Sequence, residues 1–235
     1  MEQHTLWRIG SSWDSAFAQI VLRSPDEANE INTILCRSCG NGVGYRRPYP
    51  MIFEWESGSD KIGDFLGPEM GRLVVRRTVF DTLFERFGGI QAEEVEMFQD
   101  PRLKPSQRKK RVWLPYVGPE LVELKTEATL PLSHLTTLDV AYRCEECGLE
   151  IYNMSGIERK ESRWDTKQLK LVPYVEPRVP GKGLFVELSK LESASPIFRV
   201  ERYTQMILCT DEVKRFVEER GYTNVDFLNY GTIIT

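Results

Sequence analysis

The sequence predicts an α+β protein with mixed and antiparallel sheets, few helices, and a zinc-ribbon-like four-cysteine site made from two distant CxxCG knuckles. Three observations support this prediction. Many short segments alternate apolar and polar residues, as strands with one solvated face do. Only a few segments combine helical spacing with capping residues. The motif CxxCG occurs twice.

Composition narrows the function classes. The 235 residues suffice for one large or two small domains, and 41% apolar with 28% charged residues is typical of a globular chain. A formal net charge of −4 argues against broad nucleic-acid affinity. The sequence contains no run of about 18 apolar residues, so no membrane span is predicted. The N-terminus has no secretory pattern, and we therefore expect a cytoplasmic protein. Only two histidines are present, which disfavours most histidine-based catalysis.

The first helical signals lie in the N-terminal half. Apolar residues within 12–22 are spaced as in a short helix, although the pattern is brief. The clearest helix is Val79–Phe87, where Thr78 is the expected N-cap and Gly88 and Gly89 are expected to end the helix.

A second clear helix is expected over Asp211–Arg220, with Thr210 as N-cap and Gly221 as terminator. Each clear helix is followed by glycine and then by a strand-like segment, at 92–98 and 223–228. The similarity indicates either a weak internal repeat or two common helix-to-strand corners, and the second interpretation is favoured.

Strands are expected where apolar and polar residues alternate or where short apolar runs occur. Loops are expected at 100–111, which is rich in proline and basic residues, and at 173–183. The expected strands are Leu73–Val75, Val112–Val117, Leu121–Leu124, Thr137–Tyr142, Leu149–Tyr152, Leu169–Val172, Leu184–Leu188 and Ile197–Tyr203.

Four of the five cysteines form the two motifs, and Cys209 stands apart in an apolar run. A disulfide framework would suit a short secreted chain, so two CxxC pairs here favour one tetrahedral zinc ion with four thiolate ligands. Such a site would be structural, because four cysteines leave no position for water. Buried reduced thiols or a thioredoxin-like redox motif are the weaker alternatives. The expected ligands are Cys36, Cys39, Cys144 and Cys147.

The two motifs are separated by 104 residues, far more than in a compact zinc ribbon. If all four cysteines bind one ion, a subdomain is inserted between the knuckles, which the slow growth of loop-closure entropy permits. We therefore expect a zinc-ribbon-like part from 1–50 and 137–160, an inserted α+β part over 51–136, and a C-terminal α+β part over 161–235, together forming one compact unit.

Three other patterns favour ordinary structural roles. The basic run Arg108–Arg111 is more typical of a solvated loop than of a nucleic-acid contact. The segment Pro180–Gly183 lacks the spacing of a phosphate-binding loop. His134 follows a serine, but adjacency in sequence does not indicate a catalytic arrangement.

The paired CxxCG motifs, in a chain of this length, resemble the double-CXXCG-motif family of myxobacterial proteins, which contains immunity proteins of swarm-inhibition toxin systems. Tyr49-Pro50 and the layout from Ser195 to Phe227 are also similar to the family's pattern. The motif residues that carry the resemblance are Cys36, Cys39, Gly40, Cys144, Cys147 and Gly148.

The resemblance implies a cytoplasmic immunity protein, without enzymatic activity, that holds a structural zinc ion and neutralises one cognate toxin by protein–protein interaction during bacterial competition. If the toxin is a nuclease with a basic cleft, acidic side chains would steer it, although each acidic cluster also suits a solvated face. Trp55, Trp113 and Trp164 could be anchors, but core positions are favoured. The acidic candidates are Glu93, Glu94, Glu96, Asp100, Glu54, Glu56 and Asp60.

A zinc-ribbon module that binds nucleic acid or regulates another protein is the alternative function. Steeply salt-dependent binding to DNA or RNA, without a protein partner, would distinguish it from an immunity protein.

Overall fold

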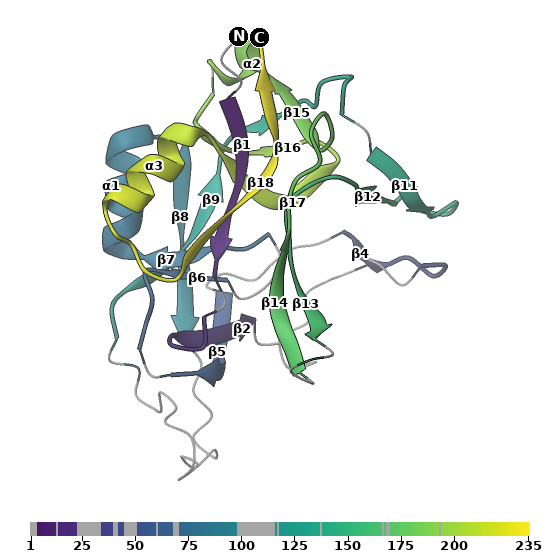
Figure 1. Cartoon of the computed structure of the whole chain (residues 1–235). Helices are drawn as coiled ribbons and strands as arrows, with labels where there is room; N and C mark the ends of the chain where they lie inside the picture. The colour runs from purple at the N-terminus through teal and green to yellow at the C-terminus, as the bar shows by residue number, and fades with distance from the viewer. Residues whose placement is uncertain are drawn as a thin grey trace.

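The chain is a mixed α+β protein with few helices, seen in a computed structural model (Figure 1). Two six-stranded sheets form the body, and three two-stranded hairpins accompany them. The structure describes residues 4–12, 14–22, 34–39, 42–44, 51–59, 61–67, 71–97, 116, 118–136, 138–165, 167, 170–192 and 194–235.

The first sheet has the strand order β10-β16-β17-β1-β18-β15. The central strand β1 pairs antiparallel with β17 and β18, whereas β15 and β10 add parallel edges beside β18 and β16. Its strands are β1 (His4–Ser11), β10 (Thr129–Leu130), β15 (Leu184–Glu187), β16 (Ile197–Val200), β17 (Tyr203–Cys209) and β18 (Val225–Ile234).

The second sheet has the strand order β2-β5-β8-β9-β7-β6. Here β9 pairs antiparallel with β7 and β8, and β5 pairs parallel with β8. Its strands are β2 (Ala18–Leu22), β5 (Met51–Gly58), β6 (Phe65–Leu66), β7 (Val74–Arg76), β8 (Ile90–Met97) and β9 (Leu121–Thr126).

Five strands of each sheet share one topology. The order β15-β18-β1-β17-β16 in the first sheet matches β5-β8-β9-β7-β6 in the second, with the same pattern of parallel and antiparallel pairs. In each unit a helix joins two parallel strands that flank an antiparallel strand: α1 (Arg77–Phe87) joins β7 to β8, and α3 (Asp211–Glu219) joins β17 to β18. The structure therefore supports an internal repeat over two unrelated corners.

The two repeats differ in which part of the chain supplies the central strand. In the second sheet β9 follows β8 directly along the sequence, whereas in the first sheet β1 comes from the opposite end of the chain to β18. His4 pairs with Ile233, so the two ends of the chain lie side by side (Figure 1). If the two ends of the chain were joined, β1 would follow β18 along the sequence as β9 follows β8.

One hydrophobic core is shared by both repeats. Val79 and Leu83 of α1 and Val213 and Val217 of α3 are buried against residues from both sheets. The helices lie next to one another (Figure 1), where the rings of Phe87 and Phe216 meet edge to face at 5.3 Å between centroids. Separate clusters cover the opposite faces of the first and second sheets.

Matching contacts join the turn after each helix to the other repeat. After α1, the Gly88 carbonyl accepts a 3.1 Å hydrogen bond from the Ser195 hydroxyl, just before β16. After α3, the Thr223 amide and hydroxyl each donate a 2.7 Å hydrogen bond to Asp64, just before β6. Because β6 and β16 occupy equivalent positions in the two repeats, the two contacts join equivalent parts of the repeats in opposite directions.

The expected helices are confirmed with changes at their N-termini. α1 begins at Arg77, so Thr78 lies inside the helix, and it ends at Gly88, where φ is 62°. Thr210 is the N-cap of α3, but its side chain makes no capping hydrogen bond. Asp211 instead accepts hydrogen bonds from the Thr5 amide at 2.8 Å and the Trp7 indole at 2.7 Å, which attach the helix to β1. A one-turn helix, α2 (Leu188–Leu191), was not expected.

Two sequence predictions of secondary structure were wrong. Residues 12–22 contain a turn and strand β2 instead of a helix, because Ile20 is buried in the second sheet's core and its neighbours pair with β5. The segment expected as one strand, Ile197–Tyr203, contains the β16–β17 turn, where Arg202 has a φ of 62°. Most of the expected strand Val112–Val117 and the whole loop at 100–111 lie outside the described residues, and part of 173–183 belongs to β14.

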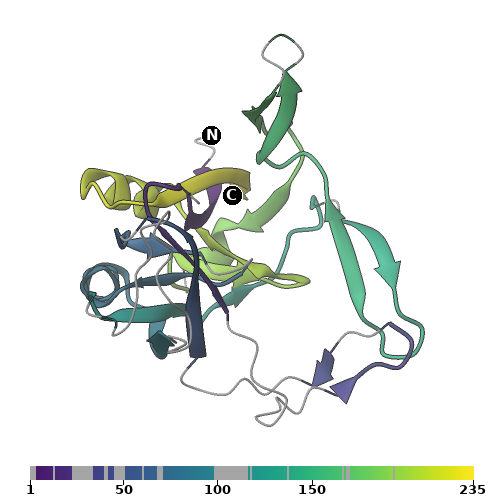
Figure 2. The same ribbon diagram turned by 90° about the horizontal axis from the view of Figure 1, so that it is seen from below.

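Three hairpins complete the fold: β3 (Ile34–Leu35) with β4 (Gly42–Gly44), β11 (Leu138–Arg143) with β12 (Glu150–Met154), and β13 (Arg159–Asp165) with β14 (Lys170–Glu176). Figure 2 shows the first two side by side at one edge of the molecule, with their turns away from both sheets. We call this pair the metal arm. The part expected to be zinc-ribbon-like is thus divided, since β1 and β2 pair within the large sheets. Among the described residues, no helix has the length and apolarity needed to cross a membrane.

The repeat predicts that a circular permutant will fold. We expect the chain to keep its structure if Thr235 is joined to Met1 by a short Gly/Ser linker and opened between Pro180 and Gly181, in an exposed turn. Stability should fall by no more than about 2 kcal/mol, because the linker closes a short gap and the cut breaks no strand. Thermal unfolding followed by circular dichroism measures this. A permutant opened inside α3, between Lys214 and Arg215, is the control, and equal failure of both would contradict the repeat.

Candidate metal centre

Each knuckle is the turn of one hairpin in the metal arm. Cys36 directly follows β3 and Cys144 directly follows β11, and in both cases the next three residues form a turn. In the second knuckle the Cys144 amide donates to the Leu149 carbonyl at 2.8 Å, and the Gly148 amide donates to the Cys144 carbonyl at 2.9 Å. Gly148 has a φ of 72°, a conformation that glycine adopts without strain. Gly148 therefore serves the tight turn of the second knuckle.

The two knuckles meet in space. All four sulfur atoms of Cys36, Cys39, Cys144 and Cys147 lie within 4.8 Å of one another. The Sγ atoms of Cys36 and Cys144 are 3.7 Å apart, and those of Cys39 and Cys147 are 3.8 Å apart. Both pairs are separated by 108 positions in sequence, so equivalent cysteines of the two motifs face each other. The prediction that these four cysteines come together is confirmed.

The spacing of the sulfurs fits a tetrahedral metal site. Metal–sulfur bonds of about 2.3 Å in a regular tetrahedron place neighbouring sulfurs about 3.8 Å apart. None of the four cysteines forms a disulfide, and the measured separations are far longer than a disulfide bond. A group of four cysteines suits zinc or an iron–sulfur centre better than a hard cation. The cluster could therefore hold one metal ion, with every coordination position occupied by sulfur.

The surroundings favour the thiolate form at one ligand. The pKa of Cys144 is lowered to about 6, and the largest cause is the hydrogen bond that the Cys147 amide donates to the Cys144 sulfur. Cys36 and Cys144 are buried, whereas Cys39 and Cys147 are partly exposed. Two buried and two partly exposed ligands place the site at the surface of the arm, with its inner half protected from solvent.

Cys209 is separate from this cluster. Its side chain is completely buried in the core shared by the two repeats. Burial raises the pKa of Cys209, so the thiol stays protonated and acts as a small apolar side chain.

The acidic candidates on β8 lie on both faces of that strand. Glu94 and Glu96 alternate with Val95, so they share one face and are exposed, whereas Glu93 lies on the other face. Lys125 Nζ is 3.4 Å from Glu93 Oε1 across the β8–β9 pair. Glu54 and Glu56 lie in β5, where only the backbone is described, and Asp100 and Asp60 lie outside the described residues.

The remaining candidate positions carry little chemistry in the structure. His134 is exposed in a turn, and Pro180-Gly181 forms a turn in which Arg178 binds the Lys182 carbonyl. The basic run and Trp113 lie outside the described residues. The side chains of Trp55 and Trp164, in β5 and β13, are likewise not described.

One group of polar residues was not predicted from the sequence. Arg8, Arg159, Tyr203 and Tyr230 line a cleft between the first sheet and strands β12 and β13. They come from four strands that are far apart along the chain. No spacing pattern could have linked them, because only the fold brings them together.

No protein-family model matches the chain, and no curated protein matches it either. The functional argument therefore depends on the geometry of the site and on the motif pattern.

The cluster predicts that Cys39→Ser will release the metal. One ion per chain should fall to nearly none, and the free energy of unfolding should drop by more than about 3 kcal/mol, because metal binding and folding are coupled. Elemental analysis and denaturant unfolding measure the two effects. A chelator should lower the melting temperature of the unmodified protein but leave that of the variant unchanged.

Cys209→Ala is the matched control. It should retain the metal and lose only about 1–2 kcal/mol, since it leaves a small cavity in the core. Loss of metal in this control, or retention of metal in Cys39→Ser, would contradict the assignment of ligands.

Proposed function

We propose that the chain is an immunity protein that binds and neutralises a cognate protein toxin, with a structural zinc ion in the metal arm. The closed four-sulfur cluster is the observation that carries this proposal. Since four thiolates leave no coordination position for water or substrate, the ion would stabilise a binding scaffold and would not activate a reacting group. The paired CxxCG motifs resemble those of immunity proteins, and this resemblance is the reason for proposing that the scaffold binds a toxin.

Zinc is the ion that best suits this role. It has no redox chemistry, and it favours four thiolates in a tetrahedron with the sulfur separations seen here. An isolated two-stranded hairpin is marginally stable, and almost every residue of β11 is exposed. A zinc ion shared between the two knuckles would hold both hairpins in place.

The arm exposes apolar side chains that a protein partner could contact. Val140, Tyr142 and Ile151 are between 41% and 47% exposed on the β11–β12 hairpin. Exposed aromatic and branched side chains are typical of interface centres, and acidic residues at an interface edge speed association with a basic partner. The acidic residues Glu145 and Glu146 are exposed in the knuckle turn of the same hairpin. In this proposal the protein acts in the cytoplasm, where it would meet a delivered toxin.

The candidate toxin is the product of the adjacent gene, and an inactivated form of it is used to test binding. We expect a one-to-one complex that survives high salt, and we expect expression of the chain to rescue cells from this toxin but not from unrelated toxins. Pull-down and survival assays measure the two results. Steeply salt-dependent binding to DNA or RNA without a protein partner would instead support a nucleic-acid-binding module.

The acidic residues of β8 provide a second test. The double substitution Glu94→Gln with Glu96→Gln should slow association with a basic toxin by up to about tenfold at low salt, because long-range steering acts mainly on the association rate. The dissociation rate should change little. Surface plasmon resonance at two salt concentrations measures both rates. Glu201→Gln with Glu219→Gln removes two exposed acids elsewhere and is the control, and equal slowing by both pairs would exclude a specific role for β8.

A further inference from the structure

A cleft of about 510 Å³ lies on the face of the first sheet opposite α3. Met206, Leu228 and Tyr230 of the sheet form one wall, and residues of β12 and β13 form the other. The connection between β12 and β13 is fixed to the sheet, since the Glu158 amide donates to the Asn229 carbonyl at 2.9 Å. The volume falls within the range of small-molecule sites, roughly 300–1,000 Å³.

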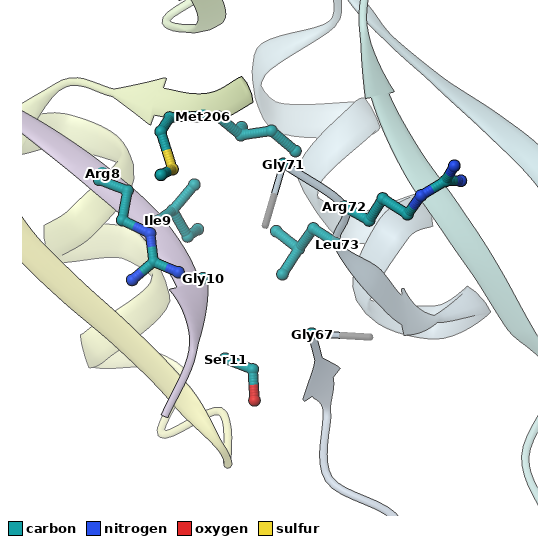
Figure 3. Close-up of a pocket in the computed structure, with 10 residues that line it drawn as sticks. Arg8, Ile9, Gly10, Ser11, Gly67, Gly71, Arg72, Leu73 and Met206 are labelled. Atoms are coloured by element: carbon teal, nitrogen blue, oxygen red, sulfur yellow. The ribbon is translucent and has the colours of Figure 1, made fainter. Parts of the chain in front are cut away.

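Arg8 projects from β1 into this region. It lines both the cleft and a neighbouring cavity of about 40 Å³, where its guanidinium extends over Gly10 (Figure 3). A Cβ atom added at Gly10 would lie 2.5 Å from Arg8 Nη2, so the absence of a side chain at position 10 makes room for the guanidinium. The guanidinium of Arg8 forms no hydrogen bond or ion pair with any residue that the structure describes. A partly enclosed guanidinium without a protein partner is suited to a ligand oxyanion.

Two tyrosines and a second arginine line the same cleft. Within the described part of the chain, the hydroxyls of Tyr203 and Tyr230 make no hydrogen bond to protein, although Tyr230 is only 5% exposed. Burial raises the pKa of both tyrosines, so both hydroxyls remain protonated donors. Arg159 also lines the cleft, and one of its nitrogens donates to the Met154 carbonyl.

The charges that face the cleft leave a positive excess. Lys160 Nζ lies 2.6 Å from Asp226 Oδ1 and bridges the two walls, so these charges offset each other. Glu161 is the other acid, and it is exposed. Neither Arg8 nor Arg159 has an acidic partner among the described residues. The apolar part of the lining, which we call the apolar floor, comprises Met154 and Ile157 of one wall and Met206 and Leu228 of the other.

We propose that this cleft binds a small ligand in which a carboxylate or phosphate is attached to an apolar or aromatic body. Arg8 and the two tyrosine hydroxyls bind the anionic group, and the apolar floor contacts the body. The site is distinct from the four-cysteine cluster, although β12 of the metal arm contributes to one wall, and it does not depend on toxin binding. Its occupant would also tie the β12–β13 segment to the first sheet, because both walls contact the ligand.

Binding is tested by isothermal titration calorimetry on the full chain with phenyl phosphate, benzoate and the neutral analogue benzyl alcohol. At least one of the two anions should bind more tightly than benzyl alcohol, and the tighter anion identifies the preferred head group. Arg8→Gln should lower the affinity for that anion by about tenfold or more, because it removes a charged group that can donate two hydrogen bonds. Arg215→Gln makes the same charge change on the exposed face of α3 and should leave the affinity unchanged.

Gly10→Ala is the second variant. It retains every charge but displaces the guanidinium of Arg8, so it should also weaken binding of the anion. The melting temperature and the metal content should stay near those of the unmodified protein. The proposal is overturned if neither anion binds better than benzyl alcohol. It is equally overturned if Arg8→Gln and Arg215→Gln reduce the affinity by the same amount.

Discussion

The meeting of four thiolates at one point is the constraint on which the metal arm depends. Each repeat contributes one CxxC turn, and the facing sulfurs are 3.7 and 3.8 Å apart. The turns lie away from both sheets (Figure 2), and almost every residue of β11 is exposed, so this hairpin has little core of its own. Without a metal, four polarisable sulfurs at van der Waals separation would contribute little to stability. With a metal, they would join two segments that are 108 positions apart.

The repeat explains why the motif is doubled. In each half of the chain a knuckle hairpin precedes a strand that later pairs in parallel with a long strand, then a short antiparallel pair, a helix and the long strand itself. The equivalent cysteines face each other, as the equivalent turns after α1 and α3 each contact the opposite repeat. One core then serves both halves, because α1 and α3 pack together against residues of both sheets. The metal site would be a second junction between the repeats, at the far end of the hairpins.

Local patterns predicted the parts of the fold that are determined locally. The glycines after α1 and α3, the apolar faces of these helices and the clustering of the cysteines all follow from the physical chemistry of neighbouring residues or of one metal ion. Residues 12–22 were misassigned because burial of Ile20 beside β5 decides their structure, and periodicity over so short a segment cannot show it. The central position of β1 and the cleft around Arg8 depend on contacts between distant strands. Such contacts leave no spacing signal in a single sequence.

X-ray absorption at the zinc edge of the protein, purified under reducing conditions, tests the central claim most directly. The account predicts a single shell of four sulfur neighbours at about 2.3 Å with no oxygen or nitrogen neighbour. A mixed shell containing a light atom would mean that one thiolate is not a ligand and that the site is open to water. Absence of zinc altogether would contradict the account, since the two hairpins would then have no common ion.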